Sequence, residues 1–382
     1  MKKLLLLLLL AAIALPLYLL LKPTPVDPVA WTPPTAPKLE GPYAPNAILK
    51  DVQRLLVGVG IGPEGTAIGD DGAVYTGYQD GRVVRLSPAG DRYRELANTG
   101  GRPLGLVVEA DGGLLVADNK GLLRIAPDGA ITTLSQNAGG VPLGFTDDVD
   151  RTADGRYAYF SDASTKFPNP HYLRDLFEHR PHGRVIVQDL VTKQSAMLFE
   201  DLYFANGVAV GPNAEWLLVA ETAAYRITRY WLKGDKAGTR DVFADNLPGF
   251  PDNLSYNGRD RIWVALPSVR NPVLDRLAQW PLLRKMLSNL PGRIQAVLIA
   301  HGEPQAFVLG FDLDGRLIAN LQYRGADAYA PIMSVEEHGP WLYFGSLSQP
   351  SIARLPLQLA VPGAAPPPAG WEQAPATPVR EN

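Results

Sequence analysis

Between residues 46 and 361 the chain repeats one pattern of alternating apolar and polar positions broken by a turn. Alternation with a period of two around an Asp-Gly turn is the strongest short-range signal for a β-hairpin. We therefore expect an all-β domain made of repeated hairpins. The copies are TAIGDDGAVYTGY, GLVVEADGGLLVAD, DDVDRTADGRYAYFSDAS, GVAVGPNAEWLLVAET, NLSYNGRDRIWVAL and MSVEEHGPWLYFGSL.

Several hairpins are followed by a third strand, such as GRVVR at 81–85 or GRVIV at 183–187. Six copies in this stretch give about 50 residues per unit, the size of a four-stranded propeller blade. A β-sandwich would contain similar strands without this repeated order. The pattern predicts a six-bladed β-propeller.

Two insertions interrupt the repeats, at Thr165–His182 and Ser268–Gly292. The second predicts two short helices divided at Pro281, with an apolar face and several basic residues. Such a segment suits a membrane surface or a cover over the pocket, and equally an ordinary helical cap.

The ends of the chain differ from this globular part. Lys2 and Lys3 precede the apolar run Leu4–Leu21, which contains Pro16 and is close to the length that spans a bilayer. We expect residues 1–22 to be an uncleaved signal anchor, a transmembrane helix with the lysines cytoplasmic and the rest extracytoplasmic. A cleaved signal peptide is the alternative. Residues 23–45 should be a Pro-rich tether, 46–361 the propeller, and 362–382 a disordered Pro-rich tail.

Composition excludes several classes of function. The chain has no cysteine, which rules out disulfides, thiolate catalysis and Cys-ligated zinc. The net charge of −3 gives no electrostatic basis for binding nucleic acid. The glycines at 60–65 match G-x-G-x-x-G, but a strand rather than a helix follows them, and no G-x-S-x-G is present.

Oxygen-bearing side chains recur at one place in four repeats, just before the first strand. They are Glu64, Asp147, Asn206 and Asp252; the first three precede the turn residue by eight positions and Asp252 by six. In a propeller, these positions converge on the mouth of the central channel. Carboxylate and amide oxygens in this number suit Ca²⁺ better than Mg²⁺. Taken singly, each residue is better explained as a turn residue, and it is the recurrence in register that favours a metal site.

Other residues are weaker candidates. Asn253 is a possible fifth ligand or substrate contact, and His171 is a possible substrate contact from the first insertion. Alternation sends Asp148 to the opposite face from Asp147, where a structural role is expected. The second repeat has Leu104 at the corresponding place.

Several segments resemble the strictosidine-synthase-like branch of the calcium-dependent gluconolactonase and phosphotriesterase propeller superfamily. They include GPEG at 62–65, FTDDVD at 145–150, LYFANGVAV at 202–210 and LPGFPDNL at 247–254. The resemblance covers nearly the whole folded part and implies one channel calcium on Glu64, Asn206, Asp252 and Asp147. Asp147 stands where the family motif has asparagine.

Two departures limit what the resemblance implies. The catalytic histidine of paraoxonases falls near Leu104, and no acid lies between Ala330 and Ser334, where strictosidine synthase has its catalytic glutamate. A synthase-type condensation is therefore disfavoured.

We expect a calcium-dependent hydrolase of a lactone or of an aryl or carboxylic ester. Asp252 or Asp147 would act as general base or nucleophile. The alternative is a non-catalytic binding or scaffold propeller that calcium stabilises.

Overall fold

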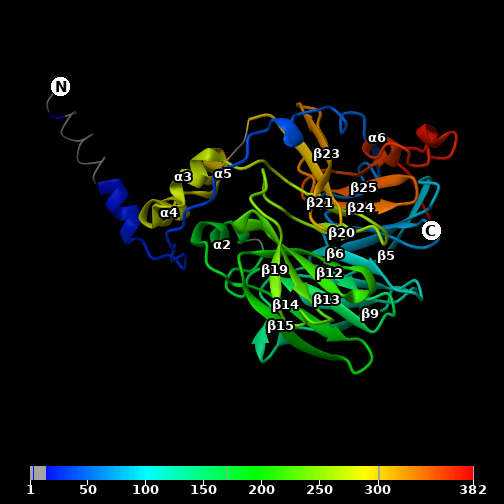
Figure 1. The fold of residues 1–382 in the computed structure, drawn as a ribbon, viewed down its shortest axis with the longest axis horizontal. Coiled ribbons are helices and arrows are strands. Elements are labelled where there is room, and N and C mark those ends of the chain that lie inside the picture. Colours follow the sequence, from blue (N-terminus) through cyan, green and yellow to red (C-terminus); the bar gives the residue numbers. More distant parts are fainter. Residues whose placement is uncertain (1–2, 4–13, 170, 300–301, 382) are drawn as a thin grey trace.

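The computed structural model describes residue 3 and residues 14–169, 171–299 and 302–381. Within them, six sheets form the body of the molecule, each with four antiparallel strands, and one of them carries a fifth, parallel strand (Figure 1). Their innermost strands are neighbours in a closed ring, β2, β6, β12, β16, β20, β24 and again β2. The predicted six-bladed propeller is thereby confirmed.

Each blade runs from an innermost to an outermost strand. The first blade consists of β2 (Thr66–Ile68), β3 (Val74–Gly77), β4 (Arg82–Leu86) and β5 (Arg92–Asn98), and the second of β6 (Pro103–Val108), β7 (Leu114–Asp118), β8 (Gly121–Ile125) and β9 (Ile131–Ser135). The third consists of β12 (Thr146–Arg151), β13 (Tyr157–Asp162), β14 (Gly183–Asp189) and β15 (Gln194–Leu202), and the fourth of β16 (Ala205–Val210), β17 (Trp216–Glu221), β18 (Arg226–Trp231) and β19 (Arg240–Ala244). The fifth consists of β20 (Leu254–Tyr256), β21 (Ile262–Ala265), β22 (Gln305–Phe311) and β23 (Leu317–Arg324), and the sixth of β24 (Ser334–His338), β25 (Trp341–Gly345), β26 (Ile352–Pro356) and β1 (Gln53–Leu55). A small hairpin, β10 (Asn137–Ala138) with β11 (Val141–Pro142), follows the second blade.

The ring is closed by strand pairing between the two ends of the propeller sequence. β1 pairs antiparallel with β26, with Gln53 opposite Arg354 and Leu55 opposite Ile352. The first strand of the domain is therefore the outer strand of the last blade. This pairing ties sequence positions about 300 residues apart, so the blades cannot separate without losing its hydrogen bonds.

The hydrophobic core lies between neighbouring blades. The strands supply fully buried side chains from both faces, for example Leu218 of the fourth blade against Val264 and Phe307 of the fifth. The alternating pattern of the sequence explains this packing, because successive side chains of a strand point to opposite faces of the sheet.

Four helices form a cap on one side of the propeller (Figure 1). The first insertion contains α2 (Tyr172–Glu178), and the second contains α3 (Pro272–Leu277) and α4 (Pro281–Ser288). The fourth helix, α5 (Gly292–Ile299), begins at the last residue of the second insertion and extends beyond it. The predicted division at Pro281 is confirmed: this proline begins α4, where its missing N–H costs nothing. The sequence did not lead us to expect helices α2 and α5.

The N-terminal segment packs against this cap. Residues 14–21 are helical, and the part of the chain that is described contains no helix long and apolar enough to cross a membrane. Most of the predicted spanning segment, residues 4–13, lies outside the described residues. The segment 23–45, expected to be a free tether, is extended but bonded to the cap: the Val29 N–H donates to the Glu178 carbonyl and the Trp31 N–H to the Ala278 carbonyl.

The C-terminal segment also differs from the expectation of disorder. β27 (Val379–Arg380) pairs in parallel with β5, and Trp371 packs edge-on against Trp341 with ring centroids 5.0 Å apart. A single aromatic anchor and a short strand hold this Pro-rich stretch against the first and last blades. The remaining short elements are α6 (Leu357–Ala360) and the 3-10 turns η1 (Gly41–Tyr43), η2 (Pro212–Ala214), η3 (Thr222–Ala224) and η4 (Trp371–Gln373).

Candidate functional site

Glu64, Asp147, Asn206 and Asp252 line a single cavity of about 360 Å³ at the cap end of the channel. Each is at most 4 % exposed. Asp147 and Asn206 are the second residues of β12 and β16, whereas Glu64 and Asp252 stand two residues before β2 and β20. The structure therefore brings together the four residues that the register of the repeats singled out.

A β-bulge explains how strands of alternating side chains present these residues to the cavity. The pairing of the innermost strand shifts between Pro103 and Leu106, between Thr146 and Val149, and between Ala205 and Val208. A bulge leaves a residue unpaired and re-aims its side chain. The same irregularity thus recurs in three blades at the level of the site.

Neighbouring inner strands approach each other closely at this level. A Cβ on Gly207 would lie 2.5 Å from the Cα of Asn253, and one on Gly65 would lie 2.1 Å from the Leu104 carbonyl oxygen. Glycine directly after Glu64 and Asn206 therefore has a packing reason, since a larger residue would push the strands apart.

Glu64 has a cationic partner that the sequence reading missed. Arg102 Nη2 lies 2.9 Å from Glu64 Oε2, its Nη1 donates to the Gly62 carbonyl at 2.8 Å, and the arginine is itself buried. Burial raises the pKa of Glu64, and the Arg102 charge and hydrogen bond partly oppose that rise. Arg102 precedes Leu104 by two residues in GRPLG, and only the fold shows that it reaches across to the first blade.

Negative charge on the other two carboxyl groups is disfavoured while the cavity holds no cation. Burial raises the pKa of Asp147 well above its usual value, and the charges of Glu64 and Asp252 add to the rise. The pKa of Asp252 is raised well above its usual value by burial and by Glu64, while hydrogen bonds from the Asn253 N–H and the Asn206 side chain oppose the rise. Three buried acids thus share one arginine, and the cavity floor favours a cation.

The amide oxygen of Asn206 is also unsatisfied. Asn206 Oδ1 is buried with no hydrogen-bond partner among the described residues. Within those same residues, no three His, Asp or Glu side chains are grouped closely enough to hold a metal ion as they stand. The donors face one cavity but are not drawn together around a common point.

The structure separates the remaining predicted residues from this cavity. Asp148 and Asn253 line a second cavity of about 480 Å³ on the opposite side of the ring. As expected for Asp148, a structural contact holds it: Oδ2 accepts the Val208 N–H at 2.9 Å. His171 is exposed before α2 and is not among the residues that line the first cavity.

Among the described residues of the last blade, no acid lines the first cavity. Pro331 and Met333 line it there, and Glu336 lies in the second cavity instead. Glu336 therefore does not lie at the floor formed by Glu64, Asp147, Asn206 and Asp252.

The cavity roof comes from the cap and the N-terminal segment. His179, at the end of α2, is stacked between Trp31 at 3.9 Å and Tyr203 at 4.7 Å between ring centroids. Burial, with the Arg284 and Arg226 charges, lowers the pKa of His179 to about 3, so its imidazole is neutral. Tyr172 also lines the cavity, and burial together with the charges of Glu64 and Asp252 raises its pKa. Sequence reasoning named His171 of this insertion, whereas His179 is the one that lines the cavity, because nothing in the pattern shows which histidine α2 turns inward.

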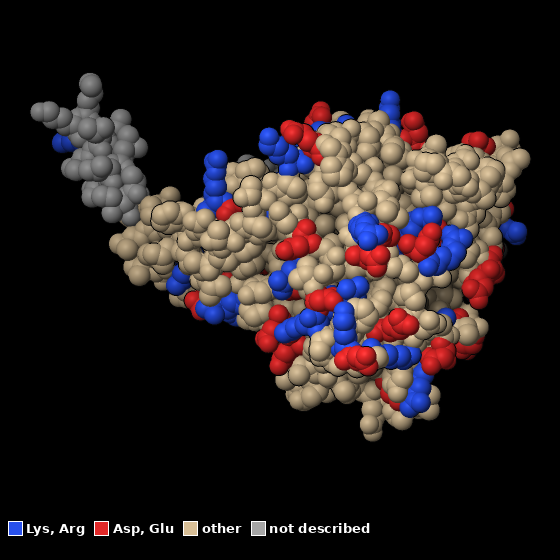
Figure 2. All heavy atoms as spheres, viewed as in Figure 1, with Lys and Arg blue, Asp and Glu red and all other residues tan. Residues whose placement is uncertain are grey.

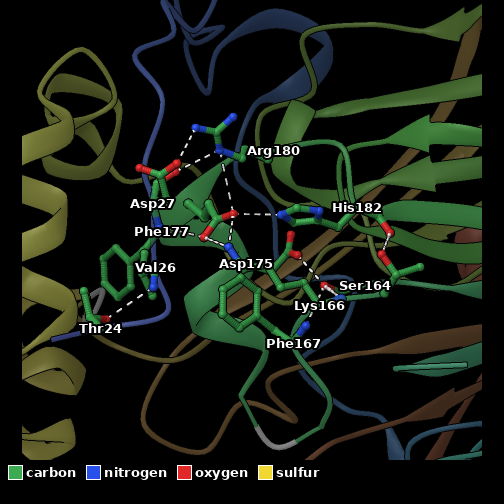
Figure 3. A network of polar contacts seen from close by, with 12 residues as sticks. Thr24, Val26, Asp27, Ser164, Lys166, Phe167, Asp175, Phe177, Arg180 and His182 are labelled. Carbon is green, nitrogen blue, oxygen red and sulfur yellow. Dashed lines mark hydrogen bonds and ion pairs between the residues drawn. The ribbon is translucent and has the colours of Figure 1, made fainter. Parts of the chain in front are cut away.

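A polar network fixes α2 to the N-terminal segment and the third blade (Figure 3). Asp27 donates its N–H to the Glu178 carboxylate, which also accepts from Lys166 Nζ and contacts His182 Nε2. At the other side of α2, Ser164 donates to Asp175, whose pKa burial raises to about 7. These contacts position α2 over the cavity, while the second carboxyl oxygen of Asp175, Oδ1, is buried with no hydrogen-bond partner among the described residues.

Arg284 joins the second insertion to the same assembly. This buried arginine of α4 donates to the carbonyls of Phe177 and Ala278 at 3.0 Å and also contacts the Val29 carbonyl. Burial lowers its pKa to about 10, which leaves it charged at neutral pH. One guanidinium therefore links α2, α3, α4 and the N-terminal segment.

Comparison with known proteins agrees with this architecture. A gluconolactonase from Xanthomonas campestris covers 88% of this chain and 99% of its own with a TM-score of 0.56 at 19% identity. A calcium-binding regucalcin from Agrobacterium tumefaciens covers 82% and 96% with a TM-score of 0.54 at 16% identity. The molecule therefore shares its propeller fold with these proteins.

Sequence relatives define the family. The strictosidine synthase model matches residues 147–235, and the strictosidine synthase-like N-terminal model matches residues 41–86. Adipocyte plasma membrane-associated protein from Salmo salar is 36% identical over 87% of this chain and 85% of its own, and strictosidine synthase-like 6 from Arabidopsis thaliana is 38% identical over 79% and 81%. The chain belongs to the strictosidine synthase-like family.

Proposed function

We propose that this protein is a calcium-dependent hydrolase that acts on a lactone or on an aryl or carboxylic ester. The observation that carries the proposal is the floor of the first cavity, where Glu64, Asp147 and Asp252 are buried beside the unpartnered Asn206 Oδ1. Hydrophobic and aromatic side chains form most of the remaining wall, as in small-molecule sites generally.

The donor chemistry fits calcium. Three carboxylates offset by one arginine leave a net negative floor, and the free amide oxygen supplies a neutral donor of the kind hard cations take. Glu64, Asp147, Asn206 and Asp252 would hold the ion. When bound, the calcium would supply Lewis-acid polarisation of a substrate carbonyl.

The protein side chains have separate tasks in this proposal. The buried aromatic walls exclude water around an ester or lactone group, and the neutral His179 and Tyr172 orient it from the roof. Asp252 or Asp147 would accept the proton of the attacking water, or attack directly. Glu64, fixed by Arg102, remains a ligand.

The test uses the full-length protein in detergent with a panel of phenyl acetate, p-nitrophenyl butyrate and γ- and δ-lactones. We expect turnover in calcium and none in chelator. Asp252→Asn and Asp147→Asn should lower kcat at least a hundredfold, and the variant that still binds calcium by calorimetry identifies the base. Asp314→Asn, an exposed acid outside the cavity, is the control. No turnover on any panel substrate, together with a large fall in Tm on chelation, would instead establish a calcium-stabilised scaffold.

We also propose that the chain is anchored in a membrane through residues 1–22, with the propeller extracytoplasmic. The apolar run Leu4–Leu21 behind two lysines supports this, as do relatives named plasma membrane-associated. Retention of the full chain in the membrane pellet after alkaline carbonate extraction, and protease access to the propeller from the outside only, are the expected results.

A further inference from the structure

A third cavity, which is apolar, adjoins the candidate site beneath the N-terminal helix. It has a volume of about 250 Å³, and its lining comes from the N-terminal helix and from α2, α3, α4 and α5. The lining is Leu19, Phe177, Val273, Leu274, Leu277, Leu283, Met286, Leu287, Leu290 and Gln295. Gln295, the polar member, already donates its amide to the carbonyls of Ser288 and Leu290. The cavity therefore offers a ligand almost nothing but hydrocarbon.

Phe177 and Leu274 line both this cavity and the acid-floored cavity. The two spaces consequently lie on either side of these two side chains. A ligand with its polar group at Glu64, Asp147 and Asp252 would have the apolar cavity as the continuation of its own pocket. Protein interiors keep few voids, and an apolar cavity of this size takes apolar ligands rather than water.

The cavity keeps its shape through polar contacts at its edge. Asn289, directly after α4, donates its side-chain amide to the Leu19 carbonyl at 2.9 Å and to the Lys22 carbonyl at 3.2 Å. This amide binds the end of the N-terminal helix to the cap. The cavity wall is thus built by specific bonds and is not a loose gap between helices.

The outer surface around the cavity is apolar as well. Leu17, Leu21, Trp280 and Ile294 are each about half exposed or more. In Figure 2 uncharged surface dominates the helices next to the N-terminal end, in contrast to the mixed charges over the blades. Val273 and Leu283, which line the cavity, are themselves 52 % and 42 % exposed, so the cavity borders the apolar outer surface.

We propose that this cavity is a subsite for the hydrocarbon chain of the substrate, so that the enzyme prefers esters or lactones with a long alkyl or acyl chain. The reactive carbonyl lies over the acidic floor, and the chain passes Phe177 and Leu274 to end beside Leu19. The preference rests on the proposed hydrolase function, whereas occupation of the cavity by a chain does not require turnover.

Chain-length dependence tests the preference. The full-length protein is assayed with p-nitrophenyl butyrate and with p-nitrophenyl decanoate, each below its critical micellar concentration. The measured quantity is kcat/KM for the decanoate divided by kcat/KM for the butyrate. Each methylene that enters the cavity should raise kcat/KM about fourfold until the space is filled. Leu283→Trp and Met286→Trp fill the cavity and should lower the ratio at least tenfold. Leu282→Trp, on the same helix but outside the cavity lining, should leave it unchanged within about twofold.

A binding readout separates the two proposals. Dodecanol with a terminal diazirine is photo-crosslinked to the full chain in nanodiscs, and the labelled peptides are mapped. Labelling of α3 and α4 residues that line the cavity, lost in Met286→Trp and kept in Leu282→Trp, supports the subsite even if no ester is hydrolysed. Hydrolysis with no chain-length preference and labelling unchanged in Met286→Trp would overturn the subsite and leave the hydrolase. Loss of both readouts overturns both.

Discussion

Removal of the Arg102 charge tests how the acidic floor is stabilised. Arg102→Met keeps a long apolar side chain but deletes the guanidinium that lies 2.9 Å from Glu64 Oε2 and 2.8 Å from the Gly62 carbonyl. Both side chains of the ion pair are less than a tenth exposed, at 9 % and 5 %. Glu64 would then be a third buried carboxylate beside Asp147 and Asp252 with no cation opposite it.

Breaking a buried ion pair by removing one partner costs about 3–5 kcal/mol. A domain of this size unfolds with an entropy that converts each kcal/mol to about 1.5 °C. We therefore expect Arg102→Met to lower Tm by roughly 5–7 °C in chelator. Saturating calcium should reduce the loss, because the ion replaces part of the missing positive charge.

The assay is thermal unfolding of the full-length protein, followed by circular dichroism in chelator and in calcium. The double variant Glu64→Gln/Arg102→Met should recover most of the loss in chelator, because the uncompensated charge is gone. Arg316→Met, at an exposed ion pair in a turn, is the control and should change Tm by less than 1 °C. An unchanged Tm for Arg102→Met, or no recovery in the double variant, would show that Glu64 does not carry its charge in the folded protein.

Three further predictions concern the cap and the ring. Burial raises the pKa of Asp175 to about 7, so the folded protein holds a proton that the unfolded chain releases above about pH 4, and stability falls as pH rises between these values. Asp175→Asn should remove about 1.4 kcal/mol per pH unit from this slope in urea titrations, and an unchanged slope would contradict the assignment. Trp31→Ala removes the stack on His179, and hydrogen exchange should accelerate in residues 26–36 while the blade strands stay protected. Gly207→Ala places a Cβ 2.5 Å from a neighbouring backbone atom and should lower the free energy of unfolding by about 1–3 kcal/mol. Gly292→Ala, with open space around the added Cβ, is the control and should leave the free energy of unfolding unchanged. Equal effects of the two substitutions would refute the packing argument.

The sequence was sufficient for the blade count and for the four floor residues. Period-2 alternation around Asp-Gly turns is a local signal, and its repetition at near-constant length leaves few folds other than a propeller. Because equivalent positions in a closed ring point to one axis, the register of Glu64, Asp147, Asn206 and Asp252 translated directly into proximity. The helix break at Pro281 followed in the same way from the chemistry of one residue.

The sequence was insufficient wherever a contact joins segments far apart in the chain. Arg102, beside the second blade, bonds to Glu64, beside the first, and Trp31 stacks on His179, which is about 150 residues away in the chain. His171 and His179 look alike in the sequence, and only the docking of α2 turns one inward and leaves the other exposed. Pro-rich composition led us to expect a free tether at 23–45 and a disordered tail at 362–382. Composition could not predict the backbone hydrogen bonds donated by Val29 and Trp31 or the pairing of β27 with β5, because these depend on distant segments.

The sequence by itself thus determined the repeated blades and the ring of oxygen donors, since both depend on interactions within about 50 residues and on the symmetry of repetition. Only the tertiary structure decided the roof of the cavity, the cation beside Glu64 and the apolar cavity under the N-terminal helix. The physical reason is that local periodicity fixes which face of a strand is buried, whereas the partner of a buried charge or ring depends on how distant segments are packed against it.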